Sequence, residues 1–78
     1  MMNWNVYIIR CSDGTYYTGI TTDIARRLNE HNTGTGSKYT RSRTPVELEE
    51  CKMFPDRSAA SKEEYRIKQL SRANKEKL

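Results

Sequence analysis

Hydrophobic residues cluster in two short runs near the start of the chain, and this pattern predicts two strands. Residues 4–10 are rich in aromatic and β-branched side chains, and residues 16–20 repeat that composition. Such side chains favour strands, where they pack well against their neighbours. Between the runs stands the Asp13-Gly14 pair, which is typical of a tight hairpin turn. The pattern therefore predicts a β-hairpin.

The following segment has the start and stop signals of a helix. Threonine and aspartate at 21–23 offer N-cap side chains, and good helix formers follow over 24–31. Polar residues ending in Gly34 stop this helix. Residues 33–45 contain almost no apolar side chain, so we expect a long, polar and basic loop, of the kind that is often functional.

The second half of the chain predicts one strand and further helix. Apolar and acidic residues alternate over 45–51, as in a half-buried strand. Residues 56–58 can cap a helix from about 59 to 70. We expect the basic tail, residues 71–78, to add a short third helix.

The order of these elements is strand, strand, helix, strand, helix. It predicts a small α/β (α+β) domain in which a three-stranded, mainly antiparallel sheet is flanked by helices that pack against it. We expect a single domain over residues 1–78, with its core within about 4–70.

Composition limits the classes of function. The 78 residues include 14 Lys+Arg against 10 Asp+Glu, a net charge of +4, and this excess favours an anionic partner, nucleic acid first. The longest apolar run, residues 6–9, is far short of the roughly 20 residues of a transmembrane helix. Cys11 and Cys51 lack the spacing of a zinc site, and we expect them to be reduced. We therefore expect a cytoplasmic protein without membrane contact.

The positive excess lies in the 33–45 loop and in the C-terminal segment. The loop mixes bases, hydroxyls and an aromatic ring, which suits contact with phosphates and one stacked base, although a plain solvated loop explains it equally well. Basic residues near the C-terminus of a helix are also favourable without any ligand. The candidates for nucleic-acid contact are Lys38, Tyr39, Arg41, Arg43, Lys68 and Arg72.

The hairpin and the first helix carry polar residues that could act together. Tyr7 and Tyr17 lie on the two predicted strands, and Gly19 follows on the second. Arg27 and His31 are four residues apart, so they share one face of the predicted helix. Helical geometry places both beside the apolar stripe that must face the sheet. We therefore expect Arg27 and His31 to line a cleft beside the hairpin.

Together these residues resemble the motifs of the GIY-YIG nuclease superfamily, most of all its small stand-alone bacterial branch. The resemblance covers residues 4–70. Two residues of the first motif differ, and Ile20 stands where several relatives place a lysine that can assist proton removal. The matching segments are Asn5-Val6-Tyr7, Tyr17-Thr18-Gly19-Ile20-Thr21-Thr22-Asp23, Arg26-Arg27, Glu30-His31-Asn32, Asp56-Arg57-Ser58-Ala59-Ala60 and Glu64-Tyr65-Arg66-Ile67-Lys68.

The resemblance implies a metal-dependent endonuclease that hydrolyses phosphodiester bonds, in DNA rather than RNA, and that is structure-selective or directed by a protein partner. In that family Tyr17 is the candidate general base, assisted by Tyr7, and the cationic Arg27 favours the ionised phenol and grips phosphate. His31 would hydrogen-bond a phosphate oxygen or pass a proton. We expect a monomer.

The resemblance also implies one divalent ion, Mg²⁺ or Mn²⁺, held by Glu64. Helix geometry by itself does not choose between Glu63 and Glu64, since both lie near the apolar face. The motif match selects Glu64, and Gly19 is the structural residue of its motif.

Each residue also has an ordinary structural explanation. The two tyrosines suit half-buried strand positions, Arg27 could pair with Glu30 or Asp23, and Glu64 could pair with Lys68. The joint occurrence of all of them at family spacing favours the nuclease. The alternatives are a nucleic-acid-binding module with weak or no catalysis, and a protein-interaction module in which the site is a relic.

Overall fold

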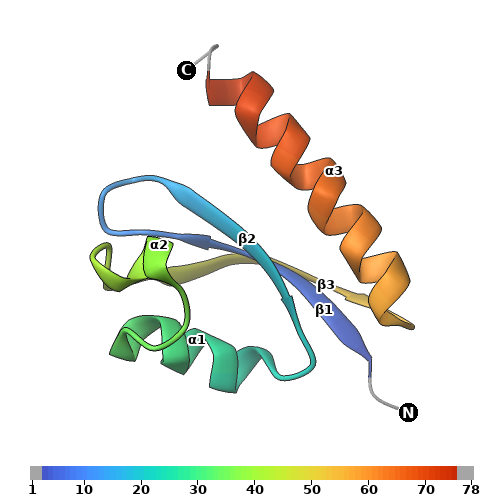
Figure 1. Cartoon of the computed structure of the whole chain (residues 1–78), viewed down its shortest axis with the longest axis horizontal. Helices are drawn as coiled ribbons and strands as arrows, with labels where there is room; N and C mark the ends of the chain where they lie inside the picture. Colours follow the sequence, from blue (N-terminus) through green and yellow to red (C-terminus); the bar gives the residue numbers. More distant parts are fainter. Residues whose placement is uncertain (1–2, 76–78) are drawn as a thin grey trace.

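The computed structural model describes residues 3–75, and it begins with the predicted hairpin (Figure 1). Strand β1, Trp4–Arg10, pairs antiparallel with β2, Tyr16–Thr21. Asp13 organises the turn, because its Oδ1 accepts hydrogen bonds from the amide and the hydroxyl of Thr15, at 3.1 and 2.6 Å. The register places Tyr7 opposite Gly19 and Ile9 opposite Tyr17.

Strand β3, Glu47–Phe54, pairs antiparallel with the other edge of β1, so the strand order is β2-β1-β3. The predicted three-stranded antiparallel sheet is thus confirmed. The strand covers 47–54 rather than 45–51, and its side chains are exposed rather than half-buried, except for Phe54. The cause is the position of the helices: α1 packs against the core of the hairpin and α3 packs mainly over β1 and β2, so both faces of β3 stay largely uncovered.

Helix α1, Ile24–Thr33, begins at the predicted N-cap, where Asp23 Oδ1 accepts a hydrogen bond from the Arg26 amide at 3.1 Å. It ends at Gly34, whose φ of 86° is left-handed and therefore suits glycine. Two of its residues, Ile24 and Leu28, pack against the core of the sheet.

Helix α3, Arg57–Lys75, starts after Asp56, whose Oδ1 accepts from the Ala59 amide at 2.8 Å. It is one continuous helix, so the separate short helix predicted in the tail does not form up to Lys75, and residues 76–78 of that prediction lie outside the described residues. No break separates the two predicted segments because good helix formers continue without glycine or proline.

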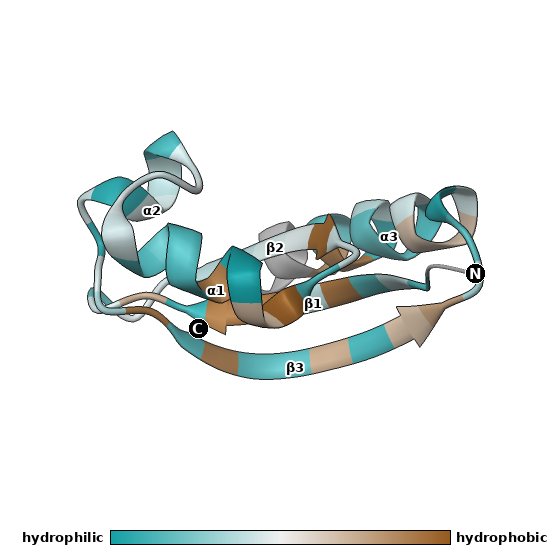
Figure 2. Cartoon of the chain, turned by 90° about the horizontal axis from the view of Figure 1, so that it is seen from below, coloured by the Kyte–Doolittle hydropathy of each residue, from teal (hydrophilic) through white to brown (hydrophobic). Residues whose placement is uncertain are grey.

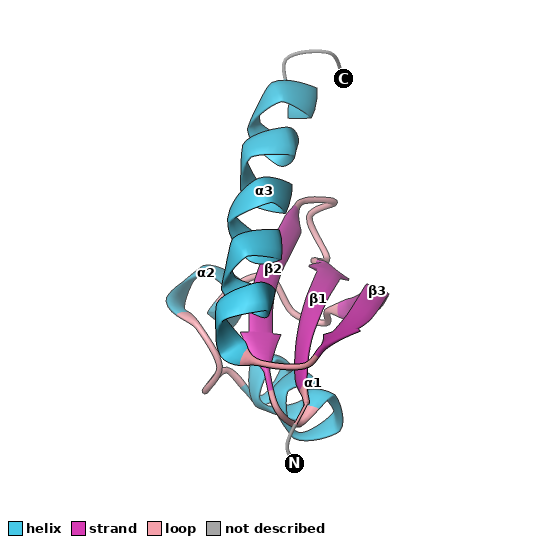
Figure 3. Ribbon diagram, turned by 90° about the vertical axis from the view of Figure 1, so that its right-hand side faces the viewer, coloured by secondary structure: helices cyan, strands magenta, loops and turns pink. Residues whose placement is uncertain are grey.

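The helices cover opposite faces of the sheet. Alternate residues of β1 point to opposite faces, and Tyr7 and Ile9 join the core cluster with α1, whereas Val6 and Ile8 face α3. Figure 1 shows the sheet between α1 and α3, Figure 2 shows the apolar β1 beside α1, and Figure 3 shows α3 running along β2. The core between the sheet and α1 contains Tyr7, Ile9, Cys11 and Val46, with Tyr17, Ile24, Leu28 and Tyr39 packed against it.

A short helix, α2, Lys38–Arg41, interrupts the segment for which the sequence predicts a loop. The Ser37 hydroxyl caps it by accepting the Tyr39 amide at 3.1 Å. The element order is therefore β-β-α-α-β-α. Among the described residues, no helix has both the length and the apolar character needed to cross a membrane.

Candidate active site

The Tyr7 side chain crosses from β1 over the backbone of Gly19 on β2. The two residues are paired in the register, and Tyr7 is only 1% exposed. A Cβ atom at Gly19 would lie 2.7 Å from Cζ of Tyr7, which is shorter than the distance that Cβ atoms in proteins keep from non-bonded atoms. Gly19 therefore leaves the space in which the phenol ring lies, which agrees with its predicted structural role.

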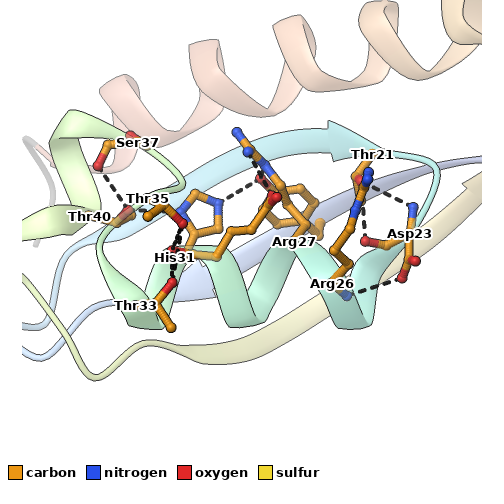
Figure 4. A network of polar contacts seen from close by, with 11 residues as sticks. Thr21, Asp23, Arg26, Arg27, His31, Thr33, Thr35, Ser37 and Thr40 are labelled. Atoms are coloured by element: carbon orange, nitrogen blue, oxygen red, sulfur yellow. Dashed lines mark hydrogen bonds and ion pairs between the residues drawn. The ribbon is translucent and has the colours of Figure 1, made fainter.

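The Tyr7 hydroxyl contacts two side chains of α1, Arg27 and His31, both of which are labelled in Figure 4. Its oxygen lies 2.9 Å from His31 Nε2 and accepts a longer hydrogen bond, 3.4 Å, from Arg27 Nε. The spacing of four residues places the two α1 side chains one turn apart on the same face. The predicted face of α1 is thus turned toward the hairpin, as expected.

His31 is enclosed. Its exposed fraction is 0%, and its second ring nitrogen, Nδ1, lies 2.8 Å from the Thr40 hydroxyl of α2. The Tyr17 ring meets the imidazole edge-on at a centroid distance of 5.3 Å. Burial lowers the pKa of His31, the Arg27 charge lowers it further, and Glu30 opposes both. The imidazole is therefore neutral at pH 7, with both nitrogens engaged inside the protein.

Arg27 is half-buried and stays charged. Its hydrogen bond to Tyr7 raises the pKa of the guanidinium, and burial opposes this rise. Nη1 donates to Glu30 at 3.2 Å, the pairing considered from the sequence. Nη2 has no hydrogen-bond partner among residues 3–70, whose side chains the structure describes, so one edge of the planar fork is available to a phosphate.

Burial also raises the pKa of the Tyr7 phenol, and the hydrogen bond from Arg27 opposes this effect. Coulombic interactions with Tyr17 and Glu64 raise this pKa further, to a smaller extent. Tyr7 is consequently a neutral phenol near pH 7.

Glu64 belongs to the other long helix. It lies on α3, which packs over β1 and β2 on the face opposite α1. Its carboxylate accepts from Lys68 Nζ at 3.1 Å, so the pairing considered from the sequence is present, and its side chain is 24% exposed. An exposed ion pair of this kind is weak, so another cation can replace Lys68 at the Glu64 carboxylate.

Glu63 is held elsewhere, which distinguishes it from its neighbour. Both of its carboxylate oxygens accept from Arg66 at 2.7 Å, and Lys52 Nζ lies 3.7 Å away. The hydrogen bonds from Arg66 hold the pKa of Glu63 below its usual value. Of the two acids that helix geometry left open, Glu64 is the one less committed to internal contacts.

The donor set offers one carboxylate to a metal ion. No group of three His, Cys, Asp or Glu side chains in residues 3–75 could enclose a metal. Mg²⁺, however, keeps several waters and is often held by one or two carboxylates together with substrate phosphates. Glu64 therefore fits a Mg²⁺ or Mn²⁺ ion that the substrate helps to bind.

Two residues of the predicted nucleic-acid set have internal contacts. The Tyr39 ring stacks on Tyr17 at a centroid distance of 5.9 Å, and the Arg43 guanidinium lies 4.1 Å from the centre of the Tyr39 ring. Arg43 Nε also donates to Asp13 at 2.9 Å, which ties the segment after α2 to the hairpin turn. Tyr39 and Arg43 thus hold the fold together in addition to any contact with a ligand.

The other members of the set lie at the surface, with one exception. Lys38 and Arg41 are exposed on α2, and Lys68 is exposed beside Glu64. The side chain of Arg72 lies outside the described residues.

Sequence reasoning missed Thr40 and Gly36. Thr40 is fully buried beside His31, and a Cβ atom at Gly36 would lie 2.7 Å from His31 Nδ1. The available signal was the serine at 37, an N-cap residue that predicts a helical turn through 38–41. Such a turn would have brought Thr40 back toward the preceding helix.

Comparison with known proteins gives consistent results. The sequence model of the GIY-YIG catalytic domain family matches residues 3–77. A UPF0213 protein of Halobacterium salinarum is 64% identical over 74 residues, which cover 95% of this chain and 96% of that protein. The solution NMR structure of a UPF0213 protein from Bacillus halodurans has a TM-score of 0.58 and 49% identity, covering 97% of this chain and 81% of that one. The solution NMR structure of a protein from E. faecalis has a TM-score of 0.63 and 43% identity, covering 99% and 82%.

Proposed function

The chain belongs to the GIY-YIG family, and from this premise we propose that it is a divalent-metal-dependent endonuclease that hydrolyses phosphodiester bonds in DNA. One observation carries the proposal. The hydroxyl of Tyr7 lies within hydrogen-bond distance of both Arg27 and His31, which share one face of α1. Three residues of the family motif, far apart in the sequence, are thus in contact, and this supports a common role for them.

Tyr17 is the general base in this proposal. It is half-buried rather than enclosed, so its hydroxyl can meet a water molecule, whereas Tyr7 is 1% exposed. A free phenol is ionised in only about one molecule in a thousand at pH 7, so a nearby cation is needed. Arg27 is the cation of this site, and Tyr7 holds it in place through Nε.

Arg27 has a second task, at the phosphate. Its free Nη2 edge can donate to a non-bridging oxygen while Nε and Nη1 remain bound to Tyr7 and Glu30. A guanidinium fixed in advance stabilises charge that develops at phosphorus without reorganising. His31 orients Tyr7 from inside, since its buried ring has no open route to the substrate.

Glu64 would hold the metal ion, which when bound supplies positive charge to the leaving oxygen of the cleaved bond. To do so Glu64 must release Lys68, and that lysine is then free to contact a phosphate. The cationic side chains of Lys38 and Arg41 on α2, with Lys68 and Arg72, provide the remaining phosphate contacts of the proposal.

A nucleic-acid-binding module without catalysis is the second candidate. It is favoured by the enclosure of Tyr7 and by the ion pair between Glu64 and Lys68, which occupies the metal ligand. The basic side chains on α2 would serve binding in either case.

The test compares cleavage and binding of flapped, branched, single-stranded and duplex DNA, and of matched RNA, with Mg²⁺ or Mn²⁺. We expect Tyr17→Phe, Arg27→Ala and Glu64→Gln each to lower the cleavage rate by ~10²-fold or more. Glu63→Gln is the matched control for Glu64→Gln, because its carboxylate is bound to Arg66 and Lys52. Binding without cleavage by the wild type, unchanged in Glu64→Gln, would establish the binding module instead.

A further inference from the structure

His31 makes two hydrogen bonds whose directions are not free. A neutral imidazole has one N–H donor and one acceptor nitrogen, so one partner must donate to it and the other must accept from it. Its partners are the Tyr7 hydroxyl at Nε2, 2.9 Å away, and the Thr40 hydroxyl at Nδ1, 2.8 Å away. Which partner donates decides the tautomer.

At the Tyr7 end, the direction is fixed by Arg27. The guanidinium has no acceptor, so the 3.4 Å contact is a donation from Arg27 Nε to the phenol oxygen. The hydroxyl proton of Tyr7 then has His31 Nε2 as its acceptor among the described residues. If Nε2 carried a proton instead, the Tyr7 hydroxyl would face two donors, and its own proton would be buried without a partner.

At the Thr40 end, the local helix fixes the same direction. The Thr40 hydroxyl donates to the carbonyl of Ser37 at 3.3 Å, the back-bonding typical of threonine in a helical turn. Its oxygen is then the acceptor that remains for His31, so Nδ1 carries the proton. Both His31 and Thr40 are 0% exposed, so water does not compete for these bonds.

We propose that Thr40 is a positioning residue that holds His31 as the Nδ1–H tautomer, so that Nε2 accepts the proton of Tyr7. The chain of bonds then runs in one direction, from Arg27 through Tyr7, His31 and Thr40 to the carbonyl of Ser37. The charged and titratable groups that face the imidazole are Tyr7 on β1, Tyr17 on β2, and Arg27 and Glu30 on α1.

This arrangement matters for the phenol. With its proton directed inward, Tyr7 keeps its lone pairs turned toward Arg27, which fixes the guanidinium for phosphate. That consequence rests on the proposed nuclease function, but the tautomer itself does not, since it is a property of the free protein.

The test is a long-range ¹H–¹⁵N NMR correlation on the full chain with ¹⁵N-labelled histidine, without DNA, at neutral pH. His31 is the one histidine of the chain, so its two nitrogens are assigned without ambiguity. We expect Nδ1 to be protonated and Nε2 to be bare, in at least ~tenfold excess over the reverse tautomer. A protonated Nε2 overturns the proposal.

Three variants separate Thr40 from its neighbours. Thr40→Ser keeps the hydroxyl and should keep the tautomer, whereas Thr40→Val keeps the shape and should give a mixture of both. Tyr7→Phe removes the other partner, and we expect it to leave Nδ1 protonated because Thr40 still accepts there. This last variant decides the matter even if Thr40→Val does not fold, because a change of tautomer in Tyr7→Phe would show that Tyr7, not Thr40, sets it.

Discussion

The phenol of Tyr7 lies directly over Gly19, and the space for its ring exists because residue 19 has no side chain. Cross-strand neighbours on one face of a sheet usually share that space between two side chains. Here one side of the pair is empty, so the tyrosine extends across β2 and places its hydroxyl between two side chains of α1. A glycine in a strand that looks like a local weakness thus positions a buried polar group.

Gly19→Ala should therefore disturb the site and the fold together. The added Cβ meets the Tyr7 ring, and a small-to-large change in a packed core typically destabilises by ~1–3 kcal/mol. Urea unfolding measures this cost, and near-ultraviolet circular dichroism reports the displaced tyrosine. Gly14→Asn is the matched control, because Gly14 has open space around it and asparagine tolerates its φ of 85°. Equal stability of the Gly19 variant and the wild type would contradict the packing argument.

Stability should fall as the pH drops through the range of the histidine. The pKa of His31 is lower in the folded protein than in the unfolded chain, chiefly because the ring is buried. Between the folded pKa and the unfolded value of about 6.5, the unfolded state binds more protons, so the free energy of unfolding rises with pH there. It becomes independent of His31 above about pH 7, and its slope is at most ~1.4 kcal/mol per pH unit.

Urea unfolding between about pH 5 and 8 checks this expectation, with His31→Gln as the variant in which the slope disappears. The chain has one histidine, so no other imidazole contributes. The lowered pKa values of Asp13 and Glu63 act in a separate, more acidic range, where stability is lost as those carboxylates become protonated. A slope that persists in His31→Gln would mean that another group titrates.

Arg27→Lys should abolish most of the proposed cleavage although it keeps the charge. Lysine has no planar fork, so it cannot bind Tyr7, Glu30 and a phosphate at once. We expect the single-turnover rate to fall by ~10²-fold or more. Arg26→Lys is the control, because Arg26 is exposed on the same helix and its described hydrogen bond is made by the backbone. Comparable rates for both lysine variants would argue against the role of the fork.

The basic residues of α2 and Arg43, which follows it, should divide into two kinds. Lys38→Ala and Arg41→Ala should each weaken binding to duplex DNA. Each should also reduce the steepness with which the logarithm of the binding constant falls with the logarithm of the salt concentration, by about 0.9 for every phosphate contact that is lost. Arg43→Ala should instead lower the melting temperature, because Arg43 lies on Tyr39 and binds Asp13. Fluorescence anisotropy over a salt series and thermal unfolding separate the two effects. A salt slope that none of the three variants changes would place the DNA elsewhere.

Local patterns in the sequence were enough for the hairpin, α1 and the start of α3. Each has a signal that acts over a few residues: the Asp13-Gly14 turn, and the N-cap side chains of Asp23 and Asp56. The exposure of β3 and the helix α2 were predicted wrongly. An alternating pattern does not show whether a helix will cover the strand, and a single turn of helix is too short to show a period.

The motif spacing along the chain selects Tyr7, Tyr17, Arg27 and Glu64 as candidate site residues without any structure. How their elements pack is visible only in the fold. The strand register sets Tyr7 over Gly19, Thr40 of α2 packs against His31, and α3 carries Glu64 on the face of the sheet opposite α1. These relationships join residues distant in the chain, so they depend on how whole elements pack, and a pattern read along one segment carries no information about the neighbour that segment will contact.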